Sequence, residues 1–198
     1  MYINIGRGVG AGLIINGRIL QGSSVSAGEL GHLVMVKNGE KCNCGARGCL
    51  ETLASAKAIE KQAQRMVKQA PQSLLFHLAK GVPNRINLEM IAQAAKEQDP
   101  LAVSLFVQAA EWIGLAVAGM INILNPDIIM LGGRVVRTAE EIIMTKVRTV
   151  AKENALPALF EMVTFVQPKL GPLSGAMGAI AAVKQRLGDA YPGYAVNP

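Results

Sequence analysis

The order of the expected secondary-structure elements is the feature that most constrains the fold. Strand patterns come first, at residues 2–5 and on both sides of Asn16-Gly17, and helical patterns then alternate with short apolar strands. This order is typical of an α/β fold with a mixed sheet. Because a strand opens the chain with no helix before it, we expect a domain fragment whose sheet has partners upstream.

Turn and capping residues mark the expected element boundaries. Asn16-Gly17 between β-forming residues predicts a hairpin, because both turn positions need positive φ. Three residues are expected to cap the N-termini of helices. The helix capped by Ser55 should stop before Pro71, and the helix capped by Asn87 should reach about Gln98. The helix that starts at Asp99-Pro100 should reach Leu124. The remaining expectations are a glycine-rich turn at residues 6–12, strands at 33–36, 128–131 and 162–166, a capping box at 138–141 that opens a helix, a final helix at 174–187 and a tail at 191–198.

The longest uncharged apolar run, Trp112 to Leu124, is too short to cross a bilayer comfortably. We therefore expect a buried helix there, no membrane segment and a cytoplasmic protein. The net charge is +6, and part of the excess lies at Lys57, Lys61, Arg65 and Lys68, which are spaced to share one helix face. That face is either a basic stripe that binds nucleic acid or an ordinary solvent-exposed surface. We favour the solvated surface, because no aromatic residues interleave with the charges.

Three clustered cysteines are the strongest chemical signal. Cys42, Cys44 and Cys49 lie within eight residues, on a glycine-bearing loop, and His32 precedes them by ten residues. An odd number of cysteines so close together does not suggest a disulfide framework. Three thiolates and an imidazole form a common closed, tetrahedral Zn²⁺ site, and soft sulfur ligands disfavour magnesium and calcium. Reduced structural cysteines or a redox pair are the alternatives.

Two carboxylates flank this loop. Glu29 comes three residues before His32, and Glu51 follows Cys49 closely. Beside an ordered loop they could accept hydrogen bonds from a polyol, and they could equally be surface acids or residues at a helix start. The second histidine, His77, lies among leucines and a phenylalanine and is interpreted as an ordinary helix residue.

Several motifs together resemble the ROK family (repressors, open reading frames and sugar kinases). They are the Ala-Gly-Glu-Leu-Gly-His of residues 27–32, the cysteine motif of residues 42–51, and the glycine-bearing segments 8–12, 125–133 and 175–179. The resemblance implies an actin-like, ribonuclease-H-like lobe with a zinc loop at about residues 32–51. It implies Zn²⁺ on His32, Cys42, Cys44 and Cys49, and sugar hydroxyls facing Glu29, His32 and Glu51.

Kinases and repressors of this family are expected to differ at the nucleotide site. The chain has three aspartates, Asp99, Asp127 and Asp189, and none matches the catalytic base of the kinases. Arg7 replaces the usual threonine of the kinases, and Arg134 replaces a third glycine after Gly132-Gly133. We therefore interpret Gly8, Gly10, Gly132 and Gly133 as a possible vestigial nucleotide or phosphate region.

The resemblance thus favours the repressor branch over the kinase branch. Residues 1–198 would form the C-terminal lobe, which binds a sugar or sugar phosphate, carries Zn²⁺, forms a homodimer or higher oligomer and has no enzymatic activity. DNA would be bound only through an N-terminal helix-turn-helix, which, like the first lobe, would lie outside this chain. One alternative is the C-terminal lobe of an ATP-dependent sugar kinase, and another is a purely structural zinc domain.

Overall fold

The computed structural model describes the backbone of residues 1–190 and their side chains except those at 172 and 185–190. The chain divides into two compact units, Met1–Val166 and Gln167–Pro198, and each is described by itself. The second unit contains the 3-10 turn η4 (Gly171–Leu173) and helix α9 (Ser174–Ala190). The final helix was therefore predicted correctly, whereas the expected tail at 191–198 lies outside the described residues.

A four-stranded mixed sheet organises the first unit. Its order is β2-β1-β5-β6, formed by β1 (Tyr2–Ile5), β2 (Val9–Gly12), β5 (Ile128–Gly132) and β6 (Thr164–Val166). β2 is antiparallel to β1, while β5 and β6 continue the sheet in parallel. The mixed sheet predicted from the element order is confirmed.

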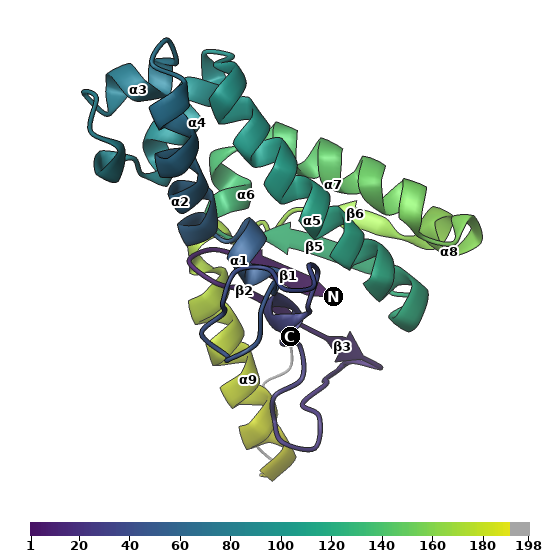
Figure 1. Cartoon of the computed structure of the whole chain (residues 1–198). Coiled ribbons are helices and arrows are strands. Elements are labelled where there is room, and N and C mark those ends of the chain that lie inside the picture. The colour runs from purple at the N-terminus through teal and green to yellow at the C-terminus, as the bar shows by residue number, and fades with distance from the viewer. Residues whose placement is uncertain (191–198) are drawn as a thin grey trace. The chain divides into compact units, whose positions relative to one another are not determined.

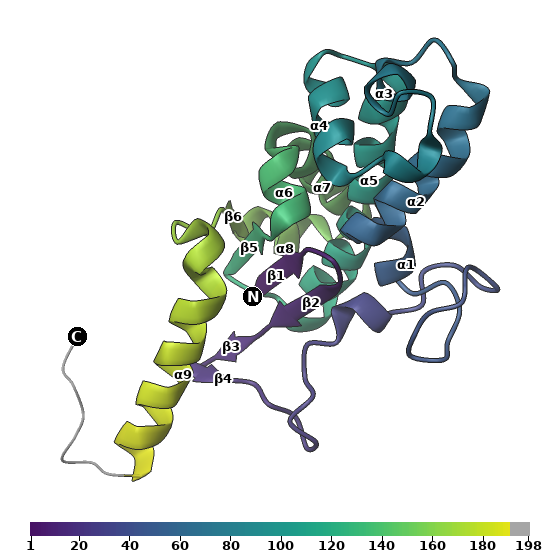
Figure 2. The same ribbon diagram turned by 90° about the vertical axis from the view of Figure 1, so that its left-hand side faces the viewer.

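The predicted hairpin is also present. Strands β3 (Ile14–Ile15) and β4 (Arg18–Ile19) form a separate two-stranded ribbon. Asn16 and Gly17 have φ angles of 52° and 75°, as the turn requires. Figure 2 shows this ribbon at the opposite end of the first unit from helices α2, α3 and α4.

Helices make up most of the rest of the first unit. They are α1 (Glu51–Ala54), α2 (Ala56–Met66), α3 (Leu74–Leu78), α4 (Leu88–Lys96), α5 (Pro100–Leu124), α6 (Arg134–Thr138), α7 (Glu140–Asn154) and α8 (Pro157–Met162), with 3-10 turns η1 (Leu30–His32), η2 (Val67–Gln69) and η3 (Pro83–Arg85). The predicted N-caps are confirmed. Ser55, Asn87 and Asp99 accept hydrogen bonds from the backbone N–H of Ala58, Met90 and Ala102 at 3.2, 2.9 and 2.9 Å.

Helix α5 is the centre of the hydrophobic core. It runs beside α7 (Figure 1), and a Cβ on Gly114 would lie only 2.6 Å from Val150 Cβ, so the glycine allows the two helices to approach closely. Buried side chains of the sheet, such as Ile3 and Leu131, belong to the same core cluster as Ile113 of α5. Within the part of the chain that the structure describes, one helix, α5, has the length and apolar composition needed to span a membrane. However, 56% of its most apolar stretch is buried inside the protein. It is a core helix.

Four local predictions were wrong. Residues 33–36 form no strand and only Val34 bridges to Cys49, because the backbone of this segment turns to follow the cysteine loop. The glycine-rich turn is limited to residues 6–8, and residues 9–12 form β2. The helix expected after residues 138–141 is present as α7, but the capping box is absent: Thr138 belongs to α6, where its hydroxyl donates to the carbonyl of Arg134. The strand expected at 162–166 begins at Thr164, because Met162 ends α8.

Candidate metal centre and adjoining pocket

Four potential metal ligands converge beside the sheet. The ligand atoms of His32, Cys42, Cys44 and Cys49 all lie within 4.8 Å of one another. The Sγ atom of Cys42 is 3.6 Å from Nδ1 of His32, and the Sγ atoms of Cys44 and Cys49 are 3.7 Å apart. The cluster could hold one metal ion, and three sulfurs with one imidazole nitrogen are a donor set that suits Zn²⁺.

The cysteine loop folds tightly because two of its glycines tolerate very close contacts. Gly48 has a φ of 72°, and a Cβ there would lie 1.8 Å from the carbonyl oxygen of Val36. A Cβ on Gly39 would lie 2.7 Å from Cα of Gly48. The Gly48 carbonyl accepts hydrogen bonds from Met35 and Val36 at 2.8 and 3.1 Å. The backbone therefore doubles back on itself and brings the cysteines to His32.

Two further glycines hold the segment with Glu29 and His32 against β2. A Cβ on Gly28 would lie 1.9 Å from the carbonyl oxygen of Ala11, and a Cβ on Gly31 would lie 2.1 Å from that of Val9. The Ala11 N–H donates to the Gly28 carbonyl at 2.8 Å. Any side chain at these two positions would push the segment away from the strand, so these glycines set the position of the residues between and after them.

The imidazole of His32 lies between the cysteine cluster and a carboxylate. Its Nδ1 faces Cys42, and its Nε2 is 3.7 Å from Oε2 of Glu29. A metal ion held through one ring nitrogen would leave the other nitrogen to interact with Glu29 or with a ligand. The structure therefore brings two of the three predicted sugar residues together.

Glu51, the third predicted sugar residue, contacts the same strand. It is the first residue of α1, and its Oε2 accepts a hydrogen bond from the Val9 N–H at 3.0 Å. A Cβ on Gly8 would lie 2.5 Å from this oxygen, so glycine at position 8 makes room for the carboxylate. Gly8 thus has a structural role that is independent of any phosphate.

The thiols of the cluster differ in acidity. Burial, reinforced by the neighbouring thiols, raises the pKa of Cys49 to about 12. A hydrogen bond with the backbone of Ala46, together with the neighbouring cysteines, lowers the pKa of the exposed Cys44. Since metal ions bind thiolates, a metal ion would displace the proton that Cys49 retains in the free loop.

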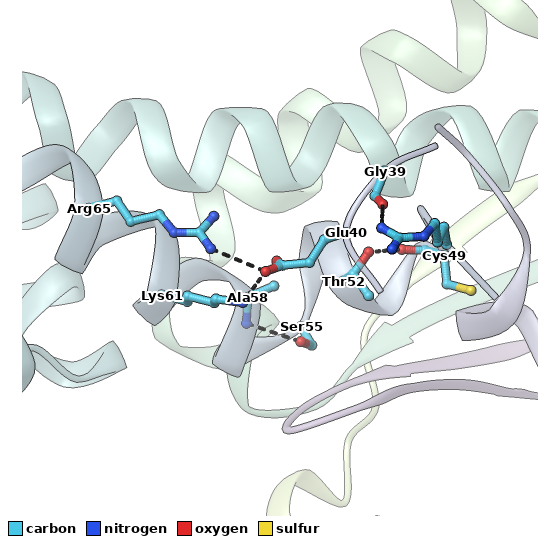
Figure 3. Close-up of polar contacts among 9 residues, drawn as sticks. Gly39, Glu40, Cys49, Thr52, Ser55, Ala58, Lys61 and Arg65 are labelled. Atoms are coloured by element: carbon cyan, nitrogen blue, oxygen red, sulfur yellow. Dashed lines mark hydrogen bonds and ion pairs between the residues drawn. The ribbon is translucent and has the colours of Figure 1, made fainter. Parts of the chain in front are cut away.

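A pocket of about 130 Å³ adjoins the cluster, between the turn after β1, the cysteine loop and the start of α2. Its lining includes Cys42 and Glu51, one residue from each predicted site. Figure 3 shows Lys61 and Arg65 of α2 reaching Glu40, which precedes the cysteines. The hydrogen bond from Lys61 lowers the pKa of Glu40.

The ion pairs of Glu40 were not predicted from the sequence. Its only signal there is an acidic residue next to the cysteine loop, and the basic helix face that binds it begins about twenty residues later. The four basic residues of that face, Lys57, Lys61, Arg65 and Lys68, are all exposed, in agreement with a solvated surface. His77 is an exposed residue of α3, outside the cluster.

The four glycines of the possible nucleotide region lie in or next to two strands of the sheet: Gly10 in β2 and Gly132 in β5, with Gly8 just before β2 and Gly133 just after β5. In the sheet register Gly10 and Gly132 lie on either side of Asn4. Gly133 has a φ of 97°, and a Cβ there would lie 2.3 Å from the carbonyl oxygen of Ile5. Close packing of the strand ends is sufficient to explain this glycine.

Arg134, directly after these glycines, forms an ion pair with Glu89 of α4. Its guanidinium donates hydrogen bonds to both carboxylate oxygens, with Nε 2.9 Å from Oε1. The pairing lowers the pKa of Glu89 and raises that of Arg134. The arginine side chain is therefore held on α4, next to the end of β5.

We expect Glu89→Gln to cost at most about 1 kcal/mol of unfolding free energy at neutral pH, because the pair is exposed to solvent. The pKa of Glu89 is lower in the folded state, so the stabilisation is present above the ordinary glutamate pKa and is lost as the pH falls through the lowered value. Urea denaturation of both proteins across the acidic range would measure this. Glu97→Gln, at an exposed acid on α4's C-cap, is the control, and a difference that persisted in strong acid would contradict the assignment.

The sheet, its helices and the cysteine–histidine loop define a lobe of the actin-like sugar-kinase fold. The sequence model of the ROK family matches residues 1–186. The chain therefore belongs to this family. In this respect the resemblance seen in the sequence is confirmed.

Its relatives include both enzymes and regulators. A glucokinase of Thermotoga maritima is 34% identical over 94% of this chain and 58% of its own length. The Escherichia coli K12 regulator NagC is 33% identical over 94% of this chain and 44% of its own length.

Solved structures show the same mixture. A ROK-family transcriptional regulator homologous to the E. coli MLC protein aligns with a TM-score of 0.75 and 36% identity, over 84% of this chain and 40% of that one. A Streptomyces griseus glucokinase, solved with glucose and AMPPNP, aligns with a TM-score of 0.81 and 28% identity, over 93% and 60%. The chain spans about half the length of the curated relatives it matches.

Proposed function

We propose that the chain is the effector-binding and oligomerising domain of a cytoplasmic ROK-family repressor that controls carbohydrate metabolism. The observation that carries the proposal is the position of His32, with one ring nitrogen at Cys42 and the other near Glu29. Glu29, His32 and Glu51 would hold the hydroxyls of a sugar or sugar phosphate. Glu51 is held by the Val9 N–H and His32 lies at the cysteine cluster, while Glu29 follows Gly28, which packs closely against Ala11 of β2.

Zn²⁺ on His32, Cys42, Cys44 and Cys49 would be structural in this proposal. Four protein ligands leave no open position, so the ion would act by stabilising the loop. Bound to one nitrogen of His32, it would also fix the tautomer and the orientation of the ring, which presents the second nitrogen to the ligand.

Arg134 supports a regulator rather than a kinase. A nucleotide must approach the backbone closely where the kinases of the family have a third glycine, and here an arginine held by Glu89 occupies that position. Asp99 is buried and committed to capping, so it is not available as a base. The glucokinase relatives favour the second candidate, the C-terminal lobe of an ATP-dependent sugar kinase.

In the whole protein, a helix-turn-helix and a first lobe would precede this domain, and two or more copies would assemble. A sugar can shift the DNA-binding arms only if its affinity differs between the two arm arrangements. The DNA-binding activity would belong to the helix-turn-helix and not to the basic face of α2.

We expect Glu29→Gln and Glu51→Gln each to weaken sugar binding by about tenfold or more, because each replaces an ionic hydrogen-bond acceptor. Calorimetric titration with glucose, N-acetylglucosamine and xylose, the sugars that the relatives' names indicate, would measure the effect. Glu97→Gln is the matched control. Unchanged affinity in both site variants would favour the purely structural zinc domain.

Assays of DNA binding and ATP turnover on the full-length protein would distinguish a regulator from a kinase. A repressor should bind operator DNA and release it when the sugar is added, without sugar-stimulated ATP turnover. Transfer of phosphate from ATP to any of these sugars would overturn the proposal in favour of the kinase.

A further inference from the structure

The cysteine cluster combines one exposed residue with two buried ones. Cys44 is exposed, whereas Cys42 and Cys49 are only 3% and 0% exposed. Oxidation of a cysteine requires that the oxidant reaches its sulfur, so susceptibility follows exposure. An oxidant dissolved in water therefore meets Cys44 before it meets either of the other two cysteines.

The sulfur of Cys49 lies within reach of that of Cys44. The two Sγ atoms are 3.7 Å apart, and a disulfide requires an approach to about 2.0 Å. The segment between the two residues contains Gly45 and Gly48, with φ angles of 97° and 72°. A Cβ on Gly45 would meet nothing within 4 Å, so the backbone next to Cys44 has room to adjust. The exposed partner can therefore make the movement while Cys49 stays packed.

Cys42 is less suited to pair with either of them. Its N–H donates to the carbonyl of Ala46 at 2.8 Å, and its own carbonyl accepts from the Gly45 N–H at 3.1 Å. Its Sγ is 3.6 Å from Nδ1 of His32. A bond from Cys42 to Cys44 would close a ring across a single intervening residue, where the dihedral angle that a disulfide requires is difficult to reach. The geometry therefore favours the pair with Cys49.

We propose that Cys44 and Cys49 form a reversible disulfide when the protein meets hydrogen peroxide, and that this modification releases the metal ion from the cluster. A disulfide removes two of the four ligands, and metal ions bind thiolates, so Cys42 and His32 alone would retain Zn²⁺ poorly. In a reducing compartment such a bond is transient and serves as a redox sensor. The inference concerns the cluster itself and does not depend on sugar binding.

The reaction balances with hydrogen peroxide as the oxidant. The sulfur of Cys44 attacks one peroxide oxygen, the O–O bond breaks, a sulfenic acid forms and the second oxygen leaves as water. The sulfur of Cys49 then attacks the sulfenic sulfur, the S–O bond breaks and a second water leaves. The two sulfurs lose two electrons, which the peroxide gains. The departing oxygens take up two protons, from the thiols or, where the sulfurs are thiolates, from water.

The competing explanation is that the cluster is inert because the bound metal ion protects its sulfurs. In that case peroxide would leave both the thiols and the metal content unchanged. A second competitor is a disulfide between two chains through the exposed Cys44. The two competitors and the proposal therefore give different products from the same treatment.

The test treats the metal-loaded full chain with about one equivalent of hydrogen peroxide and then blocks the remaining thiols with iodoacetamide. Trypsin cuts after Lys41, Arg47 and Lys57, so residues 42–47 and 48–57 become separate peptides, the first with two cysteines and the second with Cys49. We expect these two peptides from one chain to be linked through Cys44, with Cys42 alkylated. About one Zn²⁺ should be released per disulfide, as measured with a colour-forming chelator. Dithiothreitol should restore both the thiols and Zn²⁺ binding.

Two variants form a matched pair, because each replaces one buried ligand and the readout is thiol chemistry. Cys42→Ser should still form the disulfide. Cys49→Ser has no second thiol beside Cys44, so it should stop at the sulfenic acid, which dimedone traps.

The mapping of the wild type decides the question even if a variant fails to fold. A link through Cys42, a link between two chains, or intact thiols under conditions that oxidise free glutathione would each overturn the proposal. A disulfide between Cys44 and Cys49 that forms without loss of Zn²⁺ would overturn the metal release.

Discussion

Cys44→Ser is expected to abolish stoichiometric Zn²⁺ binding and to lower the Tm by roughly 10 °C or more, because metal-binding free energy becomes folding free energy in a loop with little core of its own. Cys44 is the informative ligand to replace. Its side chain is exposed, whereas Cys42 and Cys49 are buried, so its replacement removes a ligand without creating a cavity. Metal analysis and calorimetric unfolding would measure the two effects.

The controls separate metal loss from other damage. Asn43→Ser changes an exposed neighbour that offers no ligand of the cluster, and should retain about one Zn²⁺ per chain and the wild-type Tm. A chelator should lower the Tm of the wild type to that of Cys44→Ser and leave the variant unchanged. Wild-type protein that is free of Zn²⁺ and equally stable would contradict the metal centre.

Asp99→Ala should cost about 3–4 kcal/mol of unfolding free energy, because one buried carboxylate serves two helix starts. Its Oδ1 caps α5 through Ala102 at 2.9 Å. Its Oδ2 accepts from the Ser73 hydroxyl at 2.9 Å and from the Leu74 N–H at 2.7 Å at the start of α3. Alanine would leave these donors without an acceptor inside the protein.

Two comparisons test this explanation by urea denaturation. Asn87→Ala removes an exposed cap with a single hydrogen bond and should cost about 1 kcal/mol. Asp99→Asn keeps one acceptor oxygen and should lie between the two. If Asp99→Ala cost no more than Asn87→Ala, the shared cap would not contribute as the geometry indicates.

Much of the fold could be predicted because its signals are local. Ser55, Asn87 and Asp99 each cap the helix they precede, and Asn16-Gly17 turns a hairpin, through contacts within three residues of the chain. The capping box at Thr138 failed because the threonine already belongs to another helix, α6. The strand before it ends at the buried Gly132, and helix α6 begins at Arg134 and includes the threonine in its own last turn.

For the candidate site, the sequence by itself determined which side chains can bind a metal. Three cysteines in eight residues with a histidine nearby form a ligand set, and the glycines between them allow the loop to close. Only the tertiary structure decided how this loop is attached. Glu51 reaches the Val9 N–H across 42 residues, and Glu40 meets Lys61 across 21.

Such long-range contacts cannot be recognised from sequence periodicity or composition, because neither partner restricts the residue types next to it in the chain. They arise when β2, the cysteine loop and α2 pack together. The same packing brings Arg7, Lys41 and Lys57 to one pocket. Helix caps and turns could therefore be predicted from the sequence, because they depend on neighbouring residues. The charge of the pocket could not, because it results from the way in which three distant segments pack together.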